Sequence, residues 1–405
     1  MISVKAGSSF EEKQRCCGCG VCVNACPQKC ISMEEDREGF LYPAIDQERC
    51  INCNLCERVC PVIQAESDRE FAQQGYIVQH RNDEVRKDST AGGAFTAIAQ
   101  YVLSQGGVVF GAAYDENFAV HHLAVEIEEE LRRFRNSKYV QSRTVESFEK
   151  TKEYLLDGRM VCFSGTPCQI EGLKRYLRKD YEKLITVDVV CHTVPSPLVF
   201  SKYVQMQKQK IGDDIWNIRF RDKHYGYQYS TMTVKDRAGK DLYAYGIDTD
   251  PMLRAFFANV CDRPSCYDCQ FKKRYRVSDF TIWDCYPVYE FNKAMDDDKG
   301  TTRMLVHSEK GRKIFDVIKE QMTWFIVNPD DLTRDVKEMF HSVPIPKNRK
   351  GFMEDAAAME GQVLFEKWFP ETVGVKLKRN ARIIAFRLGI YGLIKKVYAK
   401  LRHGQ

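Results

Sequence analysis

The alternation of apolar and polar positions predicts that strands and helices follow one another between residues 75 and 190. Short apolar runs rich in β-branched residues, such as "VVFGAAY" and "LITVDVV", are typical of buried strands. Longer segments with apolar positions three and four residues apart, such as "TVESFEKTKEYLLDG", are typical of helices that end at glycine. We expect strands at 75–81, 108–114, 119–127, 160–163 and 184–190, helices at 90–107 and 144–158, and a turn that opens a helix at 164–179. This order predicts an α/β domain with a mixed, largely parallel sheet.

Within this region, residues 160–190 predict a strand, a helix and a second strand that pair in parallel. Cys168 lies where the helix begins, and Cys191 and His192 directly follow the second strand. In open parallel sheets, ligands bind outside the carboxyl ends of the strands. Both cysteines are therefore expected at the edge of the sheet where a cofactor would bind.

Two later segments also have regular patterns. Residues 215–246 alternate as strands do, with a turn at Ala238–Gly239, and residues 303–307 predict a strand followed by a helix. Near the C-terminus, apolar residues recur at helical spacing among lysines and arginines, namely Ile383, Phe386, Ile390, Ile394, Val397 and Leu401. A basic amphipathic helix of this kind can lie on an anionic membrane surface, pack on the body or bind a partner. The sequence leaves these three roles open.

Length and composition narrow the class of protein. The chain has 405 residues, which predicts two or three domains, and its 44% hydrophobic content is enough for a core. No apolar run approaches the roughly 20 residues of a transmembrane helix. The net charge of +5 is due to the tail, since residues 372–405 hold nine Lys or Arg and no acid. We therefore expect no nucleic-acid binding by the nearly neutral body, and a cytoplasmic protein that reaches the inner face of a membrane if its tail binds lipid.

Two cysteine runs near the N-terminus share one spacing. Residues 16–27 and 50–61 both read C-x2-C-x2-C-x3-C-P. Two such runs are typical of bacterial two-cluster ferredoxins, in which the fourth cysteine of each run binds the cluster of the other run. Gly18 and Gly20 let the backbone approach a cluster closely. We predict one [4Fe–4S] cluster on Cys16, Cys19, Cys22 and Cys60, and a second on Cys50, Cys53, Cys56 and Cys26.

Other interpretations of these cysteines are weaker. Zinc also binds C-x2-C pairs, but its sites use two separated pairs or add histidine, and the first histidine here is His80. A disulfide framework is not favoured, because 17 cysteines are an odd number and no secretory signal precedes them. Cys17 and Cys30 fall outside the spacing, and we expect them to be small buried hydrophobic residues.

A second group of cysteines is a candidate for a third cluster. The stretch "RPSCYDCQFK" adds a C-x2-C pair to the two cysteines of the parallel strand unit. On spacing alone, this pair also fits half a zinc site, and the other two also fit inert core thiols. The expected set is Cys168, Cys191, Cys266 and Cys269, and the competing candidates are Cys162, Cys261 and Cys285.

Eight stretches in the body follow one another in an informative order: "STAGGAF", "GGVVFGAAYD", "NSKYVQS", "FSGTPCQIEGLKRYL", "VDVVCHTVPSP", "FRDK", "RPSCYDCQFK" and "MDDDKGT". With them, residues 75–342 resemble the beta subunit of coenzyme F420-reducing hydrogenases and dehydrogenases. The resemblance implies FAD and a further [4Fe–4S] cluster, whose four cysteines lie inside the matching stretches. It also implies that the flavin is bordered by Ser89, Thr90, Gly92, Gly93, Ser137, Lys138, Tyr139 and Gln141.

The residues of the expected flavin site have suitable chemistry. Hydroxyls at Ser89 and Thr90 can donate hydrogen bonds, and Gly92–Gly93 at a helix start lets backbone N–H groups approach a pyrophosphate. Lys138 supplies a positive charge, although a simple helix cap would explain the Ser-Thr-Gly stretch as well. The chain departs from the family pattern at "CHTVP" and at "TIWDCYPVYE", so its substrate can differ from the deazaflavin.

We therefore predict an FAD-dependent iron–sulfur oxidoreductase that exchanges electrons with a ferredoxin-type partner. Its flavin would reduce or oxidise coenzyme F420 or another organic small molecule by hydride transfer. His192 is a candidate proton donor, with a structural histidine as the alternative. The alternative function is a non-catalytic electron-transfer subunit docked to a separate enzyme. Expected domains are a two-cluster module at 1–65, a flavin and cluster domain at 75–345, and a helical basic tail at 346–405.

Overall fold

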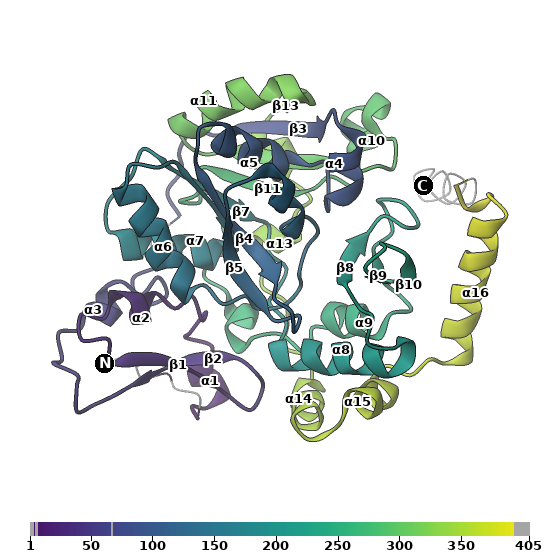
Figure 1. Ribbon diagram of the computed structural model, residues 1–405, viewed down its shortest axis with the longest axis horizontal. Coiled ribbons are helices and arrows are strands. Elements are labelled where there is room, and N and C mark those ends of the chain that lie inside the picture. Colours follow the sequence, from purple (N-terminus) through teal and green to yellow (C-terminus); the bar gives the residue numbers. More distant parts are fainter. Residues whose placement is uncertain (1–3, 5–6, 66–67, 393–405) are drawn as a thin grey trace.

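The computed structural model describes residue 4 and residues 7–65 and 68–392 (Figure 1). A large sheet lies in the middle of the molecule, with the N-terminal module on one side and a smaller sheet on the other. Helix α16 (Val373–Arg387) lies beyond the smaller sheet. In this part of the chain, no helix combines the length and the apolar character needed to cross a membrane.

The large sheet has eight strands in the order β13-β3-β12-β11-β7-β6-β4-β5. The pairs β4–β6, β6–β7 and β7–β11 are parallel, and the other neighbours are antiparallel. The parallel pairing predicted for residues 160–190 is thus confirmed, and the mixed sheet has its parallel strands at its centre. The strands are β3 (Gln74–His80), β4 (Val108–Tyr114), β5 (Val120–Val125), β6 (Val161–Gly165), β7 (Leu184–Val189), β11 (Phe280–Asp284), β12 (Thr302–Val306) and β13 (Met322–Val327).

Neighbouring residues of a strand point to opposite faces of the sheet. Both faces of this sheet are apolar, and helices cover both of them. Val109 and Cys162 belong to the core under helices α5 (Ala94–Ser104) and α11 (Glu309–Ile318). Val108 and Val161 belong to the core under the other two helices. These are α6 (Val145–Leu156) and α7 (Pro167–Leu177).

Helix α5 begins later than its apolar pattern predicts, whereas helix α7 begins next to Cys168, as predicted. Helix α5 begins at Ala94, because Gly93 adopts a left-handed conformation with φ 88° and ends the preceding turn. Helix α7 begins at Pro167, where Thr166 and Gln169 form a capping box. Both starts lie beside the carboxyl ends of strands, and this position matters for the site below.

The smaller sheet is antiparallel and belongs to a second core. Its order is β10-β9-β8, as the strand pattern of residues 215–246 predicts. Phe200, Phe220 and Phe352 are fully buried in the core beneath it. The elements are β8 (Asn217–Asp222), β9 (Thr231–Lys235), β10 (Asp241–Gly246), α8 (Pro197–Ile211), α9 (Pro251–Phe257), α14 (Arg349–Ala358) and α15 (Gly361–Trp368).

The tail expected from residue 346 onward is helical, but its first part is not a tail. Helices α14 and α15 bury apolar side chains in the same core as α8, so α16 is the one helix of residues 346–392 that lies outside it. Arg382 of α16 bonds to Asp248 at 3.2 Å, and Arg379 donates to the Tyr245 hydroxyl at 2.9 Å. The expected apolar positions Ile394, Val397 and Leu401 lie outside the described residues.

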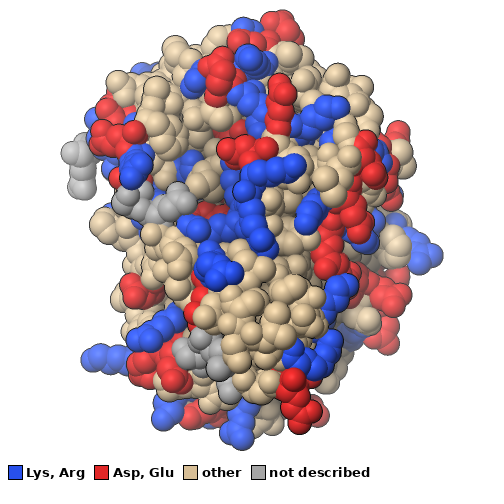
Figure 2. All heavy atoms as spheres, turned by 90° about the vertical axis from the view of Figure 1, so that its left-hand side faces the viewer, with Lys and Arg blue, Asp and Glu red and all other residues tan. Residues whose placement is uncertain are grey.

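The N-terminal module has its own two-stranded antiparallel sheet and docks against the large domain. Asn24 donates to the Val145 carbonyl at 2.6 Å, and the Thr144 hydroxyl donates to the Cys19 carbonyl at 2.9 Å. On the face of the molecule that includes this module, acidic and basic side chains are intermixed (Figure 2). The module contains α1 (Phe10–Lys13), α2 (Val21–Ala25), β1 (Ile31–Glu35), β2 (Leu41–Ile45) and α3 (Leu55–Arg58).

Short helical elements complete the described chain. They are α4 (Asp83–Asp88), η1 (Glu128–Arg133), η2 (Pro264–Asp268), α10 (Val288–Phe291), η3 (Lys293–Met295), η4 (Lys319–Gln321), α12 (Pro329–Thr333) and α13 (Lys337–Phe340). Two of them matter for the sites: η1 directly precedes residues that line a large cavity, and η2 carries the candidate cluster residue Cys266, with Cys269 directly after it.

Candidate functional site

The first predicted set of cluster cysteines gathers where the N-terminal module meets the large domain. Cys19 and Cys22 are buried, and Cys16 and Cys60 are half-buried. Burial raises the pKa of the Cys22 thiol, and the neighbouring Cys16 and Cys60 thiolates raise it further. The four residues thus lie close enough to interact electrostatically, although they come from two separate runs. Their role as ligands stays a prediction.

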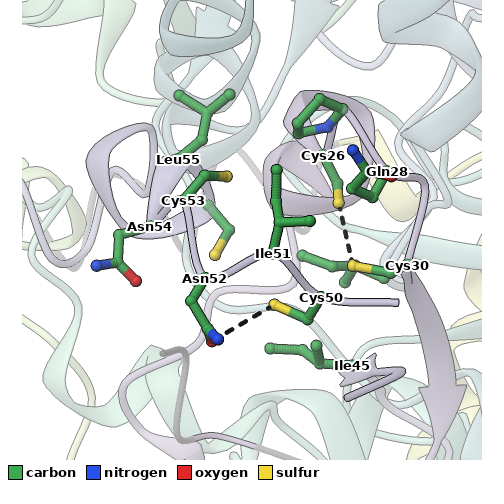
Figure 3. A pocket seen from close by; sticks show the side chains of 13 residues that line it. Cys26, Gln28, Cys30, Ile45, Cys50, Ile51, Asn52, Cys53, Asn54 and Leu55 are labelled. Carbon is green, nitrogen blue, oxygen red and sulfur yellow. Dashed lines mark hydrogen bonds between the residues drawn. The ribbon is translucent and has the colours of Figure 1, made fainter. Parts of the chain in front are cut away.

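The second predicted set lines a pocket within the module (Figure 3). Cys26 reaches it from the first run, and Cys50, Cys53 and Cys56 come from the second. Cys30 lies in the same pocket, with its sulfur 3.4 Å from that of Cys26. Cys30 is buried, as expected of a small hydrophobic residue, but it is also a fifth thiol beside a predicted cluster.

The two cysteine runs fold alike because the residues on either side of the second cysteine of each run have positive φ. These residues are Gly18 and Gly20 in the first run, with φ of 71° and 76°. In the second run Asn52 and Asn54 occupy the same places, with φ of 52° and 56°. Glycine and asparagine tolerate this region best, so the sequence repeat extends from the cysteines to the backbone between them.

Replacing Gly18 by alanine should destabilise the docked module. The new Cβ would lie 2.4 Å from Nε2 of Gln141 and 2.8 Å from Cζ of Arg263, at a backbone angle that alanine disfavours. We expect a loss of about 1–3 kcal/mol, seen as a lower midpoint of thermal unfolding. Gly7→Ala is the control, since no heavy atom lies within 4 Å of a Cβ there. Equal effects of both changes would contradict this account of the interface.

The third predicted set comes together from three elements of the large domain. Cys168 lies at the start of α7, Cys191 follows β7, and η2 supplies Cys266 with Cys269 beside it. Burial raises the pKa of the Cys266 thiol, and the thiolates of the other three raise it further. The competing cysteines lie elsewhere in the core, at Cys162 in β6, Cys261 under the smaller sheet and Cys285 after β11.

In the described ranges, no three Cys, His, Asp or Glu side chains form a group that could hold a single metal ion. A cluster of four irons on the third set stays a prediction.

A large cavity opens at the carboxyl ends of the central strands, the edge where ligands of parallel sheets bind. It has about 1430 Å³ of empty space, part of which is open to solvent. Ser164, Val189 and Asp284 line it from the ends of β6, β7 and β11. Six of the eight residues expected at the flavin also line it: Ser89, Thr90, Gly93, Ser137, Lys138 and Tyr139.

The other two expected flavin residues do not line this cavity. Gly92 faces the sheet, where a Cβ would lie 2.5 Å from the carbonyl oxygen of Val78. Gln141 points toward the N-terminal module and accepts a hydrogen bond from Arg263 at 2.8 Å. Both are therefore packing residues of the surrounding structure.

Contacts within the cavity wall refine the roles of its polar residues. The hydroxyls of Thr90 and Ser137 lie 3.1 Å apart, so the two expected flavin stretches meet there. Ser89 donates to the Val85 carbonyl at 2.7 Å and so closes the end of α4. The Lys138 ammonium donates to backbone carbonyls, the nearest that of Arg133 at 2.6 Å, and thus also orders its own loop.

Three buried donor groups in the cavity wall have no hydrogen-bond partner among the described residues. They are Nε of Arg135, Nδ2 of Asn136 and Nε1 of Trp283. Buried donors of this kind are costly unless a ligand or water accepts from them. A flavin dinucleotide carries carbonyl and phosphate oxygens that accept such hydrogen bonds, so the donors fit that group. Sequence reasoning missed Arg135 and Trp283, because only the fold brings them together.

Two histidines also line the cavity. His192, beside Cys191, donates through Nε2 to Oδ1 of Asn259 at 2.8 Å, and burial lowers the pKa of its imidazole. His122 is bonded on both sides, to the Ser164 carbonyl at 2.8 Å and the Ser142 hydroxyl at 3.0 Å. Burial lowers the pKa of His122 to about 4, so it is neutral at pH 7. Sequence reasoning missed His122, although its alternate position in a strand predicts that it points inward.

Comparison with known protein families finds one match in the large domain and one in the N-terminal cysteine module. Residues 158–331 match the family model for the C terminus of the coenzyme F420 hydrogenase/dehydrogenase beta subunit, and residues 15–63 match that of the 4Fe–4S dicluster domain. No curated protein sequence matches the chain. A solved chain from the F420-reducing [NiFe] hydrogenase complex of Methanosarcina barkeri is 14% identical, with a TM-score of 0.45 over 76% of this chain and 95% of that one. Residues 158–331 thus match the C terminus of the coenzyme F420 hydrogenase/dehydrogenase beta subunit family, and residues 15–63 match a 4Fe–4S dicluster domain N-terminal to it.

Proposed function

We propose that the protein is an iron–sulfur flavoprotein oxidoreductase that exchanges electrons between a ferredoxin-type partner and an organic substrate. One observation carries the proposal: Cys191 belongs to the third thiol set and also lines the large cavity. A cluster on that set would therefore lie directly beside a cofactor in the cavity. The substrate class includes coenzyme F420, and the matched family is the reason to test it first.

The three thiol sets follow one another from the surface of the module to the cavity. The second set lies beside Ile51, whose side chain is 60% exposed, and this is a suitable place for a small electron carrier to dock. The first set lies against the large domain, and Cys17 forms side-chain hydrogen bonds with Cys19 of that set and with Cys168 of the third. Bound clusters would carry single electrons, and a bound flavin would convert them to hydride chemistry.

The cavity residues have binding and positioning roles in this proposal. The unpartnered donors of Arg135, Asn136 and Trp283 hold the cofactor, and the Thr90–Ser137 contact fixes the wall between them. Because Asn259 holds the N–H at Nε2, His192 could donate a proton in the cavity only through Nδ1 of its protonated form. The expected domains at 1–65, 75–345 and 346–405 are part of the proposal, with α14 and α15 assigned to the body.

An anaerobic substrate screen tests this function. The purified chain, reduced by ferredoxin or dithionite, is offered coenzyme F420 and a panel of organic acceptors, and turnover of at least one is expected. The alternative is an electron-transfer subunit that reduces only a partner enzyme, in line with the subunit named by the family. Full cofactor content with no turnover, together with electron delivery to an added partner, would replace the enzyme with that alternative.

A second function concerns helix α16, which turns an apolar stripe away from the body. Val373, Leu377 and Ile384 are 74%, 65% and 56% exposed and recur at helical spacing, and Leu388 continues the stripe. The opposite side of the helix holds the body through Arg379 and Arg382. The exposed stripe therefore differs from the apolar set expected from the sequence, because Phe386 of that set packs against His224 and Tyr225.

The charge of α16 favours an anionic lipid surface as the partner of this stripe. Lys376, Lys378 and Arg387 are exposed around it, and the helix contains no acidic residue. A helix with an apolar stripe and basic flanks lies in the plane of a membrane interface, with its charges among the headgroups. The protein would thus be held at a membrane without crossing it.

Ile384→Glu should weaken binding to anionic vesicles at least tenfold, because it places a carboxylate in the centre of the stripe. Sedimentation with phosphatidylglycerol vesicles measures the effect, and phosphatidylcholine vesicles should bind neither protein. Val363→Glu on α15 is the control, since Val363 is similarly exposed at 53% but lies off the stripe. Failure of the intact chain to bind anionic vesicles would dismiss the membrane role.

A further inference from the structure

Arg263 is a buried residue whose backbone and side chain join two of the predicted cluster sites. Only 1% of its surface is exposed. Its carbonyl accepts from the Cys266 amide at 2.9 Å, so it helps to shape the loop of the third set. Its side chain reaches the first set, where Nε donates to the Cys16 carbonyl at 2.9 Å and Nη2 lies 3.7 Å from the Cys16 sulfur.

The remaining contacts of the Arg263 guanidinium fix its position. Nη1 donates to Gln141 at 2.8 Å, and Nη2 donates to the Leu41 carbonyl at 3.0 Å. The guanidinium also lies over the ring of Tyr42, with Cζ 4.3 Å from the ring centroid. Every partner is neutral apart from the cysteine side chains, and among the described residues no carboxylate forms a salt bridge with Arg263.

A buried positive charge without a carboxylate needs another source of negative charge. The nearest source is the cysteines: Nη2 of Arg263 lies 3.7 Å from the Cys16 sulfur, and its backbone carbonyl accepts from the Cys266 amide at 2.9 Å. Arg349, a second buried arginine between the module and the body, is different. It forms a paired salt bridge with Glu38, at 2.9 and 2.6 Å, and so has its own counter-charge.

We propose that Arg263 is a positioning residue that sets the reduction potential of the cluster held by the first thiol set. This inference rests on the proposed function, since it requires clusters at the predicted sites. A cluster gains one negative charge when it accepts an electron, and a fixed positive charge nearby stabilises that reduced form. Arg263 thereby raises the reduction potential of the first cluster. Because its backbone carbonyl bonds to Cys266, it also links the first thiol set to the loop of the third.

Arg263→Gln tests the proposal in the reconstituted full-length chain. Removal of the charge should favour the oxidised first cluster at least tenfold, a fall in midpoint potential of at least about 59 mV for one electron. Arg263→Lys keeps the charge and should retain most of the potential. An anaerobic redox titration followed by electron paramagnetic resonance measures each cluster, and iron analysis verifies that all clusters remain.

Arg349→Gln is the matched control, because it also removes a buried arginine from the interface but one that is paired with Glu38. It should loosen docking and leave the potential unchanged. If Arg263→Gln loses its clusters, Gln141→Glu decides, since a carboxylate beside Nη1 would neutralise the charge and lower the potential. The inference would be overturned if the midpoint potential of the first cluster did not change in Arg263→Gln, or in Gln141→Glu where that variant decides. An equal shift of this potential in Arg349→Gln would also overturn it. Absence of clusters from the unaltered chain would instead overturn the proposed function.

Discussion

Replacing Cys266 by serine is expected to remove one cluster and to disconnect the cavity from the N-terminal module. Cys266 belongs to the third thiol set but does not line the cavity, so the change leaves the cofactor wall intact. Iron content should fall from about twelve to about eight atoms per chain, because each cluster contains four. Dithionite-reduced ferredoxin should still reduce the N-terminal clusters, and flavin reduction should slow by at least a hundredfold.

Cys162→Ala is the matched control for this experiment. Cys162 is fully buried in β6, away from all three thiol sets, and serves only to fill the core. Its truncation should cost stability and leave iron content and flavin reduction unchanged. Retention of about twelve iron atoms in Cys266→Ser would show that this set holds no four-iron cluster.

Replacing Asn136 by aspartate should weaken flavin binding. Asn136 has φ 67°, which aspartate tolerates, and its Oδ1 accepts from the Arg221 amide at 3.1 Å, a bond that aspartate keeps. The change therefore removes mainly the unpartnered Nδ2 donor and places a negative oxygen in the cavity wall. A lost hydrogen bond to a charged group costs about 1.5–3 kcal/mol, which is more than tenfold in Kd.

Quenching of flavin fluorescence by the deflavinated chain measures this affinity. Asn328→Asp makes the same chemical change at the start of α12, outside the cavity wall, where aspartate caps a helix equally well. It should bind FAD as the unaltered chain does. Unchanged FAD affinity in Asn136→Asp would show that this donor faces something other than the flavin.

Features that depend on short stretches of sequence could be predicted well. The spacing of the N-terminal cysteines is set by the few residues between them, and the turns at Gly18 and Asn52 follow from residue types that tolerate positive φ. The parallel pairing of β6 with β7 follows from a strand, a helix and a strand in sequence. The position of Cys168 and Cys191 at one edge of the sheet follows from that pairing.

Features that depend on distant contacts could not be predicted. Arg135 and Trp283 are far apart in sequence, and only the order of strands in the sheet places both in the cavity wall. The family resemblance of its stretch places Gln141 at the flavin, but its side chain accepts a hydrogen bond from Arg263 instead. Arg263 begins the stretch "RPSCYDCQFK", but the contact of its side chain with Cys16, 247 residues away in the sequence, is formed only in the fold.

The orientation of helix α16 also depends on distant contacts and could not be predicted. Periodicity identifies α16 as an amphipathic helix, but it does not say which side faces the body. Arg379 and Arg382 of α16 bond to Tyr245 and Asp248 on the body. With these contacts formed, Leu377 and Ile384 are exposed to solvent. Polar contacts with the smaller sheet therefore decide the orientation of the helix.

Anaerobic cofactor analysis joined to a reductive titration tests the central claim most directly. The chain, purified or reconstituted without oxygen, is assayed for iron, zinc and flavin and then titrated with dithionite while its absorbance spectrum is recorded. The account predicts a brown protein with about twelve iron atoms and one FAD per chain, whose flavin is reduced through the clusters. A colourless protein that carries zinc and no flavin would contradict it.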